Sequence, residues 1–387
     1  MTRTEQTSAA SPVSQEAAGG FLHIDLAALA SNWRTLRDSA GGAEAAAVVK
    51  ADAYGTGIEQ AVPALAKAGC RTFFVAHLSE AIRVRAVAAD ATIYVLNGLF
   101  PGTPSVYLQH DLRPVLGSFE EIEEWAAFCR AQGHKHAAAI HVDTGMNRLG
   151  LTVSEGLRLQ DRTELKDFET ALLMSHFVSA EESGNPINLR QIEAFKAVRE
   201  TLPQVPASLA NSSGIFLKEK PHFDLVRPGY ALYGGNPLPD QDNPMSPVVG
   251  LEARIVQLRW VEEDDTVGYN ARWLALGRRR IATLSIGYAD GYPRSASARG
   301  KSGEELLAGQ VVVAGRLCPF AGNVSMDLIT VDVTDIPEKD LKRGDTVTVI
   351  GDTLTVDEVG RRAGTIGYEI LTNLGRRYAR IYGGRQG

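Results

Sequence analysis

The strongest constraint on the fold is a regular alternation of short apolar runs and amphipathic segments between Ala45 and Tyr233. Segments such as 57–69 and 187–202 carry apolar residues three to four positions apart, which is typical of helices that pack on a sheet. About eight strand–helix units in roughly 200 residues favour a (β/α)8 barrel. A doubly wound open sheet is disfavoured, because no Gly-rich dinucleotide loop follows the first strand. The predicted strands are 45–50, 72–76, 92–98, 112–118, 137–143, 170–177, 207–212 and 223–234.

The pattern changes after residues 234–247, which are rich in Pro, Gly, Asn and Asp and indicate a linker. From 248 to 350, alternating apolar and polar residues separated by turn residues are typical of an antiparallel sheet. We therefore expect an α/β protein with a disordered tail over 1–20, a (β/α)8 barrel over 21–240 and a mainly antiparallel β domain over 241–387. The first strand, near Phe21, could pack on the C-terminal domain instead of the barrel.

Composition excludes several classes of partner. A net charge of −6 and a pI near 5.8 disfavour a nucleic-acid binder, which usually has a basic surface. No apolar run approaches the length of a membrane span, and the first twenty residues lack the apolar core of a signal peptide. Three widely spaced cysteines without a C-x-x-C motif suit a reducing compartment. We expect a cytoplasmic protein that binds neither nucleic acid nor membrane.

Lys50 ends the first predicted strand and is followed by residues too small to shield its charge. Lysine is rarely buried without a partner, because desolvating an ammonium group is costly. Three interpretations remain open at this point. The lysine could extend its charge to solvent or a salt bridge, act as a general base, or form a Schiff base through a desolvated amine.

Other candidate residues lie in, at the end of, or shortly after the later predicted strands. In a (β/α)8 barrel the functional groups gather at the carboxyl ends of the strands, so these residues are expected to share one rim with Lys50. Each alone is most simply a solvated rim residue, but their coincidence indicates a site. They are Arg148, His176, Asn211, Ser212, Arg227, Gly229 and Tyr230.

The segments ANSSG and RPGYALYG suggest that this rim holds an anion. Gly229 permits close approach of the backbone, and the N–H groups of Gly229 and Tyr230 could point at a negative charge. Ser212 adds a hydroxyl group at a possible helix start. These features predict a phosphate site without a P-loop. A Schiff-base lysine facing a phosphate site is what pyridoxal phosphate requires.

Eight motifs give the chain a resemblance to the bacterial alanine racemases, a pyridoxal-phosphate-dependent family. The resemblance extends from about Phe21 to Tyr382, and the motifs occur in the order and spacing of the family. They are VVKADAYGTG, HVDTGMNRLG, MSHF, ANSSG, RPGYALYG, VGYNARW, GYADGYPR and GNVSMDLITVDV.

The resemblance implies an isomerase that interconverts L- and D-alanine, the latter a peptidoglycan precursor, and that works as a homodimer with shared active sites. Lys50 matches the lysine that carries the cofactor and serves as one catalytic base. Tyr269 matches the second base, which the partner subunit donates, while Tyr288 and Tyr368 match tyrosines that narrow the substrate entrance. The matched cofactor-binding positions are Lys50, Tyr54, Arg148, His176, Asn211, Ser212, Arg227, Gly229, Tyr230 and Tyr368, and the matched substrate-binding positions are Arg148, Tyr288 and Met326.

The implied chemistry explains these residue types. Racemisation removes a proton from one face of the α-carbon and returns one to the other, so bases are needed on both faces, here Lys50 and Tyr269. A nearby cation such as Arg148 favours the ionised form of a tyrosine. Arg227 matches the arginine at the cofactor's ring nitrogen, and an arginine only donates, so that nitrogen stays unprotonated. The ring is then a weaker electron sink, which should limit side reactions.

The chain departs from the family pattern at three positions. Asp52 replaces the usual Asn and Thr56 the usual His, which changes the hydrogen bonds expected around the lysine. His141 stands where many relatives have a carbamylated lysine that orients the arginine at the position of Arg148. We therefore predict no carbamate, and expect His141 or a bound anion to orient Arg148.

Four alternatives remain at this stage. The same fold could host a serine or broad-specificity racemase, because an apolar pocket rejects an added hydroxyl group by only roughly 10²-fold. A decarboxylase of the same architecture would lack the motifs DTGMNRLG and GYADGY. A non-catalytic pyridoxal-phosphate carrier would lack the C-terminal domain. A metal-dependent hydrolase could use the GHKH segment at 133–136, but no H-E-x-x-H motif is present, so a solvated His pair and no metal are expected.

Overall fold

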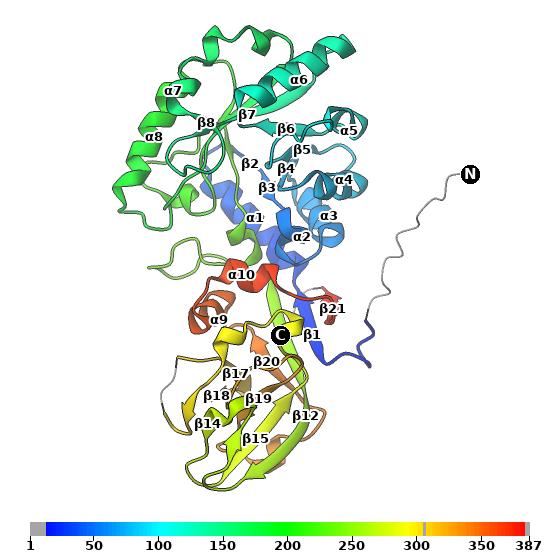
Figure 1. Cartoon of the computed structure of the whole chain (residues 1–387), viewed down its shortest axis with the longest axis vertical. Coiled ribbons are helices and arrows are strands. Elements are labelled where there is room, and N and C mark those ends of the chain that lie inside the picture. The colour runs from blue at the N-terminus through cyan, green and yellow to red at the C-terminus, as the bar shows by residue number, and fades with distance from the viewer. Residues whose placement is uncertain (1–12, 305–306, 384–387) are drawn as a thin grey trace, which may run out of the picture. The chain divides into compact units, whose positions relative to one another are not determined.

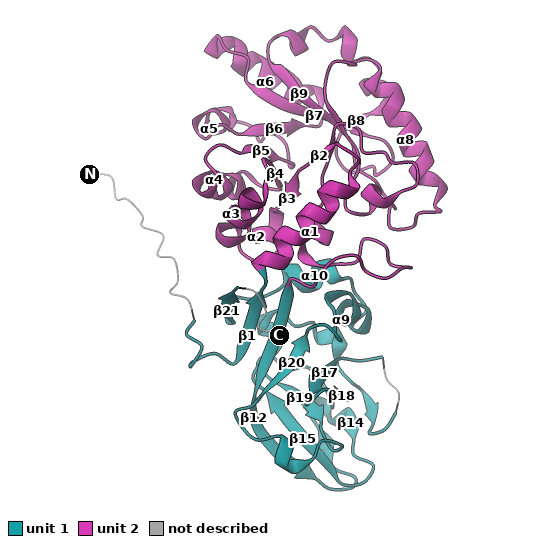
Figure 2. Cartoon of the chain, turned by 180° about the vertical axis from the view of Figure 1, so that it is seen from behind, with its two compact units in different colours: residues 1–25, 249–387 teal, residues 26–248 magenta. Residues whose placement is uncertain are grey.

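The computed structural model describes residues 13–304 and 307–383, which form two compact units. The barrel unit comprises residues 26–248, and the C-terminal unit comprises residues 13–25 together with 249–383 (Figure 1 and Figure 2). Of the predicted tail, residues 1–12 lie outside the described residues. Ala18 is buried against Phe21 and Ala379 in the C-terminal unit.

The barrel unit is built on parallel strands that pair in the order of a (β/α)8 barrel. β11 (Leu225–Val226) pairs with β2 (Glu44–Ala45), which leads directly into β3. The N–H groups of Asp224 and Arg227 donate to the carbonyl oxygens of Ala207 and Ala210, which ties β11 to β10. The ring is thereby closed, and the predicted barrel is confirmed. The remaining strands are β3 (Ala47–Val48), β4 (Thr72–Val75), β5 (Thr92–Val95), β6 (Arg113–Leu116), β7 (Ala137–Asp143), β9 (Glu169–Met174) and β10 (Ala207–Ser208), with β8 (Leu151–Thr152) beside β7.

The helices of the barrel unit follow the amphipathic segments of the sequence. In α6 (Phe119–Gln132) the buried residues recur every three or four positions, and the hydroxyl oxygen of Ser118 accepts the N–H of Glu121 at the start. Gly133, with a φ of 65°, ends this helix in the left-handed conformation. The other helices are α1 (Leu26–Ser39), α3 (Ile58–Ala68), α4 (Leu78–Val87), α5 (Pro104–Gln109), α7 (Val153–Gly156) and α8 (Pro186–Arg199). The short element α2 (Lys50–Tyr54) is a left-handed turn and not a regular helix.

Most of the predicted barrel strands are shorter than expected, above all 207–212 and 223–234. The apolar run 45–50 divides into β2 and β3, and Lys50 already begins α2. The runs 207–212 and 223–234 keep only two paired residues each, because the chain then enters 3-10 turns at Ser213–Phe216 and Tyr230–Tyr233. Apolar residues in these turns are buried as they are in strands, so hydrophobicity alone could not distinguish the two.

The C-terminal unit contains a mainly antiparallel sheet, as predicted. β12 (Val249–Val261) is its longest strand and pairs with β1 (Gly20–Ile24), β20 (Thr346–Ile350) and β15 (Arg279–Leu284). The first strand of the chain therefore belongs to this sheet, between β12 and β21 (Ala379–Tyr382). The other elements are β13 (Thr266–Val267), β14 (Trp273–Leu274), β16 (Gly300–Lys301), β17 (Gln310–Val313), β18 (Arg316–Pro319), β19 (Ile329–Asp332), α9 (Val356–Ala363) and α10 (Gly367–Thr372).

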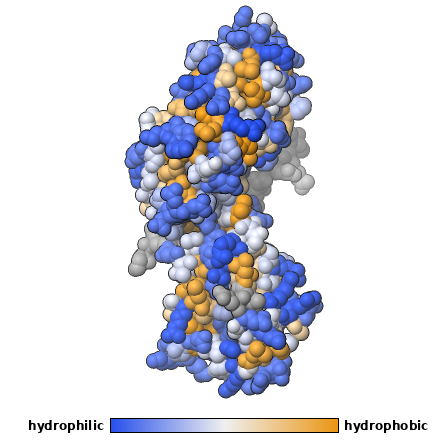
Figure 3. All heavy atoms as spheres, turned by 90° about the vertical axis from the view of Figure 1, so that its left-hand side faces the viewer, coloured by the Kyte–Doolittle hydropathy of each residue, from blue (hydrophilic) through white to orange (hydrophobic). Residues whose placement is uncertain are grey.

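The surface of both units is mixed in polarity. In Figure 3, small hydrophobic areas lie among hydrophilic ones on the face that is shown. Among the described residues, no helix combines the length and the apolar character that crossing a membrane requires.

Candidate active site

The predicted barrel residues gather at the carboxyl ends of the parallel strands. Lys50 and Tyr54 lie in α2 directly after β3, and Arg148 lies in the loop after β7. His176 follows β9, and the remaining residues follow β10 and β11. The structure thus places nine predicted positions on one rim: Lys50, Tyr54, Arg148, His176, Asn211, Ser212, Arg227, Gly229 and Tyr230.

A left-handed turn follows Lys50. The φ angles of Ala51, Asp52, Ala53 and Tyr54 lie between 52° and 56°, although none of the four is glycine. Backbone hydrogen bonds close the turn, among them Ala53 N–H to Val49 O at 3.0 Å and Gly57 N–H to Asp52 O at 2.8 Å. The turn brings Tyr54 into the interior, where its ring stacks on Tyr233 with centroids 4.6 Å apart.

The surroundings of Lys50 favour the neutral form of its amine over the charged form. Burial lowers the pKa of this amine from its ordinary value, and the positive charge of Arg148 lowers it further, while the carboxylate of Glu80 acts in the opposite direction. A neutral amine is the form that attacks a carbonyl carbon or accepts a proton. Of the three interpretations of Lys50, the structure therefore favours the two chemical ones.

Arg227 is held rigidly beneath the rim. Its Nη1 donates to Ser208 Oγ and its Nη2 to the carbonyl oxygen of Ser175, both at 2.5 Å. The residue is 3% exposed, and burial lowers its pKa to about 9, so it is still a cation at neutral pH. Its Nη2 also lies 3.4 Å from Nδ1 of His176. A fixed guanidinium with donors only can hold a group that accepts a hydrogen bond.

His176 and His141 are both neutral at pH 7. Burial, followed by the charges of Arg227 and Lys50, puts the pKa of His176 well below its usual range. Burial, followed by Arg227, also lowers the pKa of His141 to about 4, with Asp143 acting against the shift. His141 therefore adds no positive charge beside Arg148, whereas a carbamylated lysine would add a negative one.

The segments around Ser212 and Gly229 form a small cradle. The hydroxyl oxygen of Ser212 accepts the N–H groups of Gly229, at 3.0 Å, and Ala231, at 3.2 Å. A Cβ atom on Gly229 would lie 2.5 Å from the hydroxyl oxygen of Tyr54, so only glycine lets this hydroxyl approach the backbone. The Gly229 N–H, which was expected to face an anion, thus donates to Ser212 instead. The hydroxyl groups of Ser212 and Tyr54 beside a position without side-chain bulk still suit a phosphate. Asn211 accepts the N–H of Gly214 at 2.9 Å and so fixes the turn next to Ser212.

The four predicted residues of the C-terminal unit lie on its surface. Tyr269 is 69% exposed, Met326 54%, and Tyr288 and Tyr368 40% each. The N–H of Tyr288 donates to Ser325 O and that of Ala289 to Met326 O, both at 3.0 Å, which places Tyr288 beside Met326. Asn323 Nδ2 donates to the carbonyl oxygen of Tyr269 at 2.8 Å and so joins Tyr269 to the same segment. Their roles stay predictions from the resemblance.

Glu80 belongs to the rim although sequence reasoning missed it. Its Oε1 accepts the N–H of Asp52 at 3.3 Å, and its Oε2 accepts the N–H groups of Ala76 and His77 at 3.0 and 3.1 Å. The signal was present, because a glutamate three residues after a helix start is typical of a capping box. That pattern predicts only where a helix begins. Glu80 comes close enough to act on Lys50 because α4 begins where β4 ends, on the same rim.

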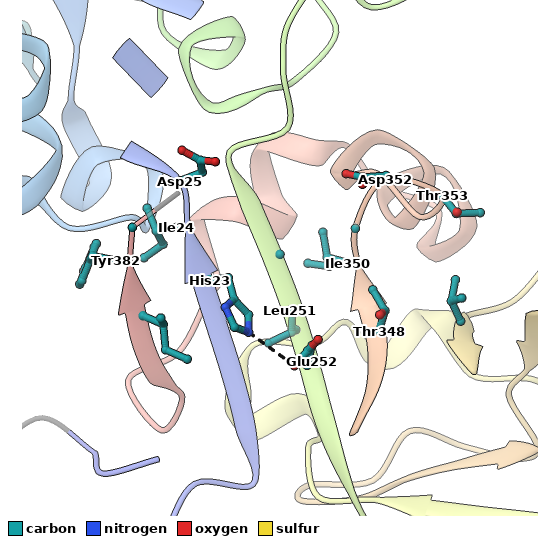
Figure 4. A pocket seen from close by; sticks show the side chains of 15 residues that line it. His23, Ile24, Asp25, Leu251, Glu252, Thr348, Ile350, Asp352, Thr353 and Tyr382 are labelled. Carbon is teal, nitrogen blue, oxygen red and sulfur yellow. Dashed lines mark ion pairs between the residues drawn. The ribbon is translucent and has the colours of Figure 1, made fainter. Parts of the chain in front are cut away.

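The sheet of the C-terminal unit has a hollow of its own, which has fewer groups suited to catalysis than the barrel rim. A hollow on the sheet of the C-terminal unit is lined by residues of β1, β12, β20 and β21, and His23 Nε2 lies there 3.5 Å from Glu252 Oε2 (Figure 4). It contains none of the predicted site residues.

Within residues 13–304 and 307–383, no three His, Cys, Asp or Glu side chains are grouped so that they could hold a metal ion. The rings of His134 and His136 lie 4.5 Å apart after α6.

Comparison with known proteins agrees with this geometry. The family model "Alanine racemase, N-terminal domain" matches residues 24–237, and "Alanine racemase, C-terminal domain" matches residues 248–382. The alanine racemase of Methylobacterium sp. (strain 4-46) is 59% identical over 94% of this chain and 98% of its own length. That of Rhizobium meliloti (strain 1021) is 46% identical over 95% of this chain and 97% of its own length.

Solved structures give the same result. The alanine racemase from Bartonella henselae with covalently bound pyridoxal phosphate superposes with a TM-score of 0.88 at 40% identity, covering 94% of this chain and 99% of that one. The biosynthetic alanine racemase from Pseudomonas aeruginosa superposes with a TM-score of 0.83 at 36% identity, with the same coverage.

Proposed function

The chain belongs to the alanine racemase family, and from this premise we propose that it interconverts L-alanine and D-alanine with pyridoxal 5′-phosphate attached to Lys50. The observation that supports this most directly is a lysine of lowered pKa on the same rim as a phosphate cradle and a fixed arginine. The match of both family models over nearly the whole chain supports a racemase over a barrel-only carrier.

The residues of the rim fit this cofactor. The hydroxyl groups of Tyr54 and Ser212 and the backbone at Gly229 and Tyr230 would hold the phosphate, with Asn211 fixing the adjacent turn. Arg227, next to His176, would donate to the ring nitrogen, and Tyr368 would contribute from the C-terminal unit. When bound, the pyridoxal group withdraws electrons from the amino acid and thereby acidifies the hydrogen on its α-carbon.

The protein's own groups would move the proton. Lys50 Nζ, whose pKa is lowered by burial and by the nearby Arg148, would accept it on one face of the α-carbon. The hydroxyl group of Tyr269 would act on the other face. The Arg148 guanidinium and the N–H of Met326 would bind the substrate carboxylate, and Tyr288 would narrow the pocket to small side chains.

A homodimer completes the proposal. Tyr269 is 69% exposed, whereas a tyrosine that exchanges a proton with a substrate must be shielded from water. We propose that a second copy of the chain covers Tyr269. The Tyr269 side chain of each copy then reaches the site that contains Lys50 of the other copy. A cytoplasmic location stays a prediction from the sequence, and fractionation of cells that produce the protein would test it.

The central experiment is a racemisation assay on the purified protein loaded with cofactor. L-alanine should be converted to an equal mixture with D-alanine, and serine should react more slowly because its hydroxyl group enters the same small pocket. Borohydride should attach the cofactor permanently to the peptide that contains Lys50. Conversion of other amino acids but not alanine, or attachment to a different lysine, would contradict the proposal.

A further inference from the structure

The turn after Lys50 needs support from outside itself. Four successive residues, Ala51 to Tyr54, have the left-handed conformation, which side chains with a Cβ disfavour. Such a conformation persists only where the surrounding structure holds it. Because Lys50 begins this turn, whatever holds the turn also fixes the direction in which the lysine leaves the backbone.

The side chain of Asp52 connects the turn to its neighbours. Its Oδ1 accepts the N–H of Ile58 at 3.2 Å and a hydrogen bond from Arg83 Nη2 at 2.5 Å. The N–H of Asp52 donates to Glu80 Oε1 at 3.3 Å. Glu80 and Arg83 are three residues apart on α4 and therefore lie on the same face of that helix. One face of α4 thus holds both the backbone and the side chain of Asp52.

Arg83 is itself fixed by a second carboxylate. Its Nε and Nη2 donate to the two carboxylate oxygens of Glu59 on α3, both at 2.7 Å. This two-point contact matches the planar guanidinium to the carboxylate and restricts its orientation. The guanidinium group therefore joins α2, α3 and α4 through Asp52, Glu59 and its own helix. Without it, Asp52 would leave an unpaired negative charge two residues from Lys50.

We propose that Arg83, clamped between Asp52 and Glu59, is a positioning residue that aims Lys50 at the reacting carbon. The inference rests on the proposed function, since it gives Arg83 a part in that reaction. Arg83 acts only through the turn. Its loss should therefore slow proton transfer at Lys50 and leave alanine binding nearly unchanged, because the proposed substrate contacts lie on other elements. Small misplacements of a catalytic group have large effects on rate.

Arg83→Gln tests the proposal in the cofactor-loaded enzyme. We expect kcat for racemisation to fall about tenfold and KM for alanine to stay within about twofold. The matched control is Arg37→Gln on α1, since the Arg37 side chain is 44% exposed against 40% for Arg83 and also pairs with a carboxylate, that of Asp38 at 2.7 Å. The control should keep both constants within about twofold. Equal constants in Arg83→Gln and wild type would overturn the proposal.

Rescue variants separate positioning from general structure. Arg83→Lys keeps a positive charge beside Asp52 but loses the two-point contact with Glu59, so kcat should fall only about threefold. Adding Asp52→Asn to Arg83→Gln removes the unpaired charge and should recover part of the lost kcat. If the double variant loses as much as the product of the two single losses, the two residues act independently and the clamp is wrong.

Hydrogen exchange provides a readout that does not depend on activity. In the loaded protein, the amides of peptide 50–58 should exchange faster in Arg83→Gln than in wild type, and those of Arg37→Gln should not. Unchanged exchange would overturn the clamp even if activity fell. A wild-type protein that does not racemise alanine would instead overturn the proposed function. If Arg83→Gln does not fold, Asp52→Asn alone breaks the same ion pair and should show the same pattern, with a loss of about threefold.

Discussion

In the barrel unit Arg227 is 3% exposed, whereas in the C-terminal unit Tyr269 is 69% exposed. The barrel groups are held by hydrogen bonds to each other and to the backbone, and burial is the first cause of the lowered pKa values of Lys50, His141 and His176. The protein environment has therefore already tuned the chemistry of the barrel rim within a single chain.

The C-terminal unit presents its residues differently. Backbone hydrogen bonds place Tyr288 beside Met326, and the Asn323 side chain joins Tyr269 to the same segment, but the side chains of all three are exposed. Exposed aromatic side chains gathered at one place are typical of a surface that another protein covers. On the proposed function, the barrel rim is a prepared half of the site, and the residues of the C-terminal unit form an exposed half that acts only after a second copy associates.

Lys50→Ala tests the prepared half and should have the largest effect. It removes both the cofactor link and one base, so racemisation should fall by about 10⁴-fold or more, and the purified protein should lose its yellow colour. Lys67→Ala, which changes an exposed lysine on α3, should leave both unchanged. Substantial residual activity in Lys50→Ala would show that the chemistry of the barrel rim does not depend on this lysine.

Tyr269→Phe tests the exposed half. Racemisation should fall by about 10²- to 10⁴-fold, the range that a general acid or base contributes. Lys50 should still exchange deuterium from solvent into one enantiomer, and D-alanine is the one expected if Tyr269 serves L-alanine. Because Tyr269 is exposed, thermal unfolding should be nearly unchanged. Equal exchange into both enantiomers would mean that the two-base assignment is wrong.

Mixed dimers test whether Lys50 of one subunit and Tyr269 of the other form one active site. When Lys50→Ala and Tyr269→Phe chains are refolded together, about half of the dimers should be mixed, and one site in each should combine an intact Lys50 with an intact Tyr269. Activity should then recover to about a quarter of wild type. If mixed dimers form without any gain over the separate variants, Tyr269 serves its own chain.

Sequence alone could predict most of the rim because its residues lie near the ends of apolar runs, and a barrel brings those strand ends together. Ser212 ends one predicted strand, and Arg227 and Gly229 lie in another. The left-handed turn at Ala51–Tyr54 could not be predicted, since a positive φ is usually indicated by glycine and none is present. The strands next to the rim were predicted too long for a related reason, because buried turns are as apolar as strands.

The contacts of the residues that depart from the family pattern also could not be predicted from the sequence. Asp52 had no evident partner in the sequence, and its partner Arg83 is 31 residues away on another helix. His141 could be recognised as unusual, but its neutral state follows from burial and the charge of Arg227, which only the closed barrel brings near. Local patterns indicate which residues share a strand end, whereas contacts between helices depend on packing over long distances in sequence.

The low pKa of His141 predicts that acid weakens the barrel. The folded-state pKa of about 4 lies below the usual value, so between about pH 6.5 and 4 the unfolded chain binds a proton that the folded chain does not. The free energy of unfolding should therefore decrease as the pH falls through this range, by about 1–2 kcal/mol at pH 5. Urea unfolding of His141→Gln should show a shallower pH dependence than wild type. Parallel curves would place His141 in a more solvated environment.

Arg377→Gln tests whether ion pairs hold Tyr288 and Met326 in place in the exposed half. Its effect on activity should be the smallest of the variants proposed. Arg377 Nε lies 3.1 Å from Asp290 Oδ1, and its Nη1 lies 2.8 Å from Asp327 Oδ1. Asp290 ends the turn that begins with Tyr288, and Asp327 follows Met326, so this arginine links the two predicted substrate-binding positions.

Because the side chains of Arg377 and Asp327 are 53% and 54% exposed, this ion pair should contribute less than about 1 kcal/mol to the free energy of unfolding. The Asp290 side chain is only 4% exposed, so the loss of its pair with Arg377 should account for most of any change in stability. We expect KM for alanine to rise about two- to threefold in Arg377→Gln, with kcat within about twofold. Arg361→Gln on α9, which breaks a similarly exposed pair with Glu358, should change neither constant. A lower kcat at constant KM would instead mean that this surface takes part in proton transfer as directly as the barrel rim. The contrast between a prepared half and an exposed half would then no longer hold.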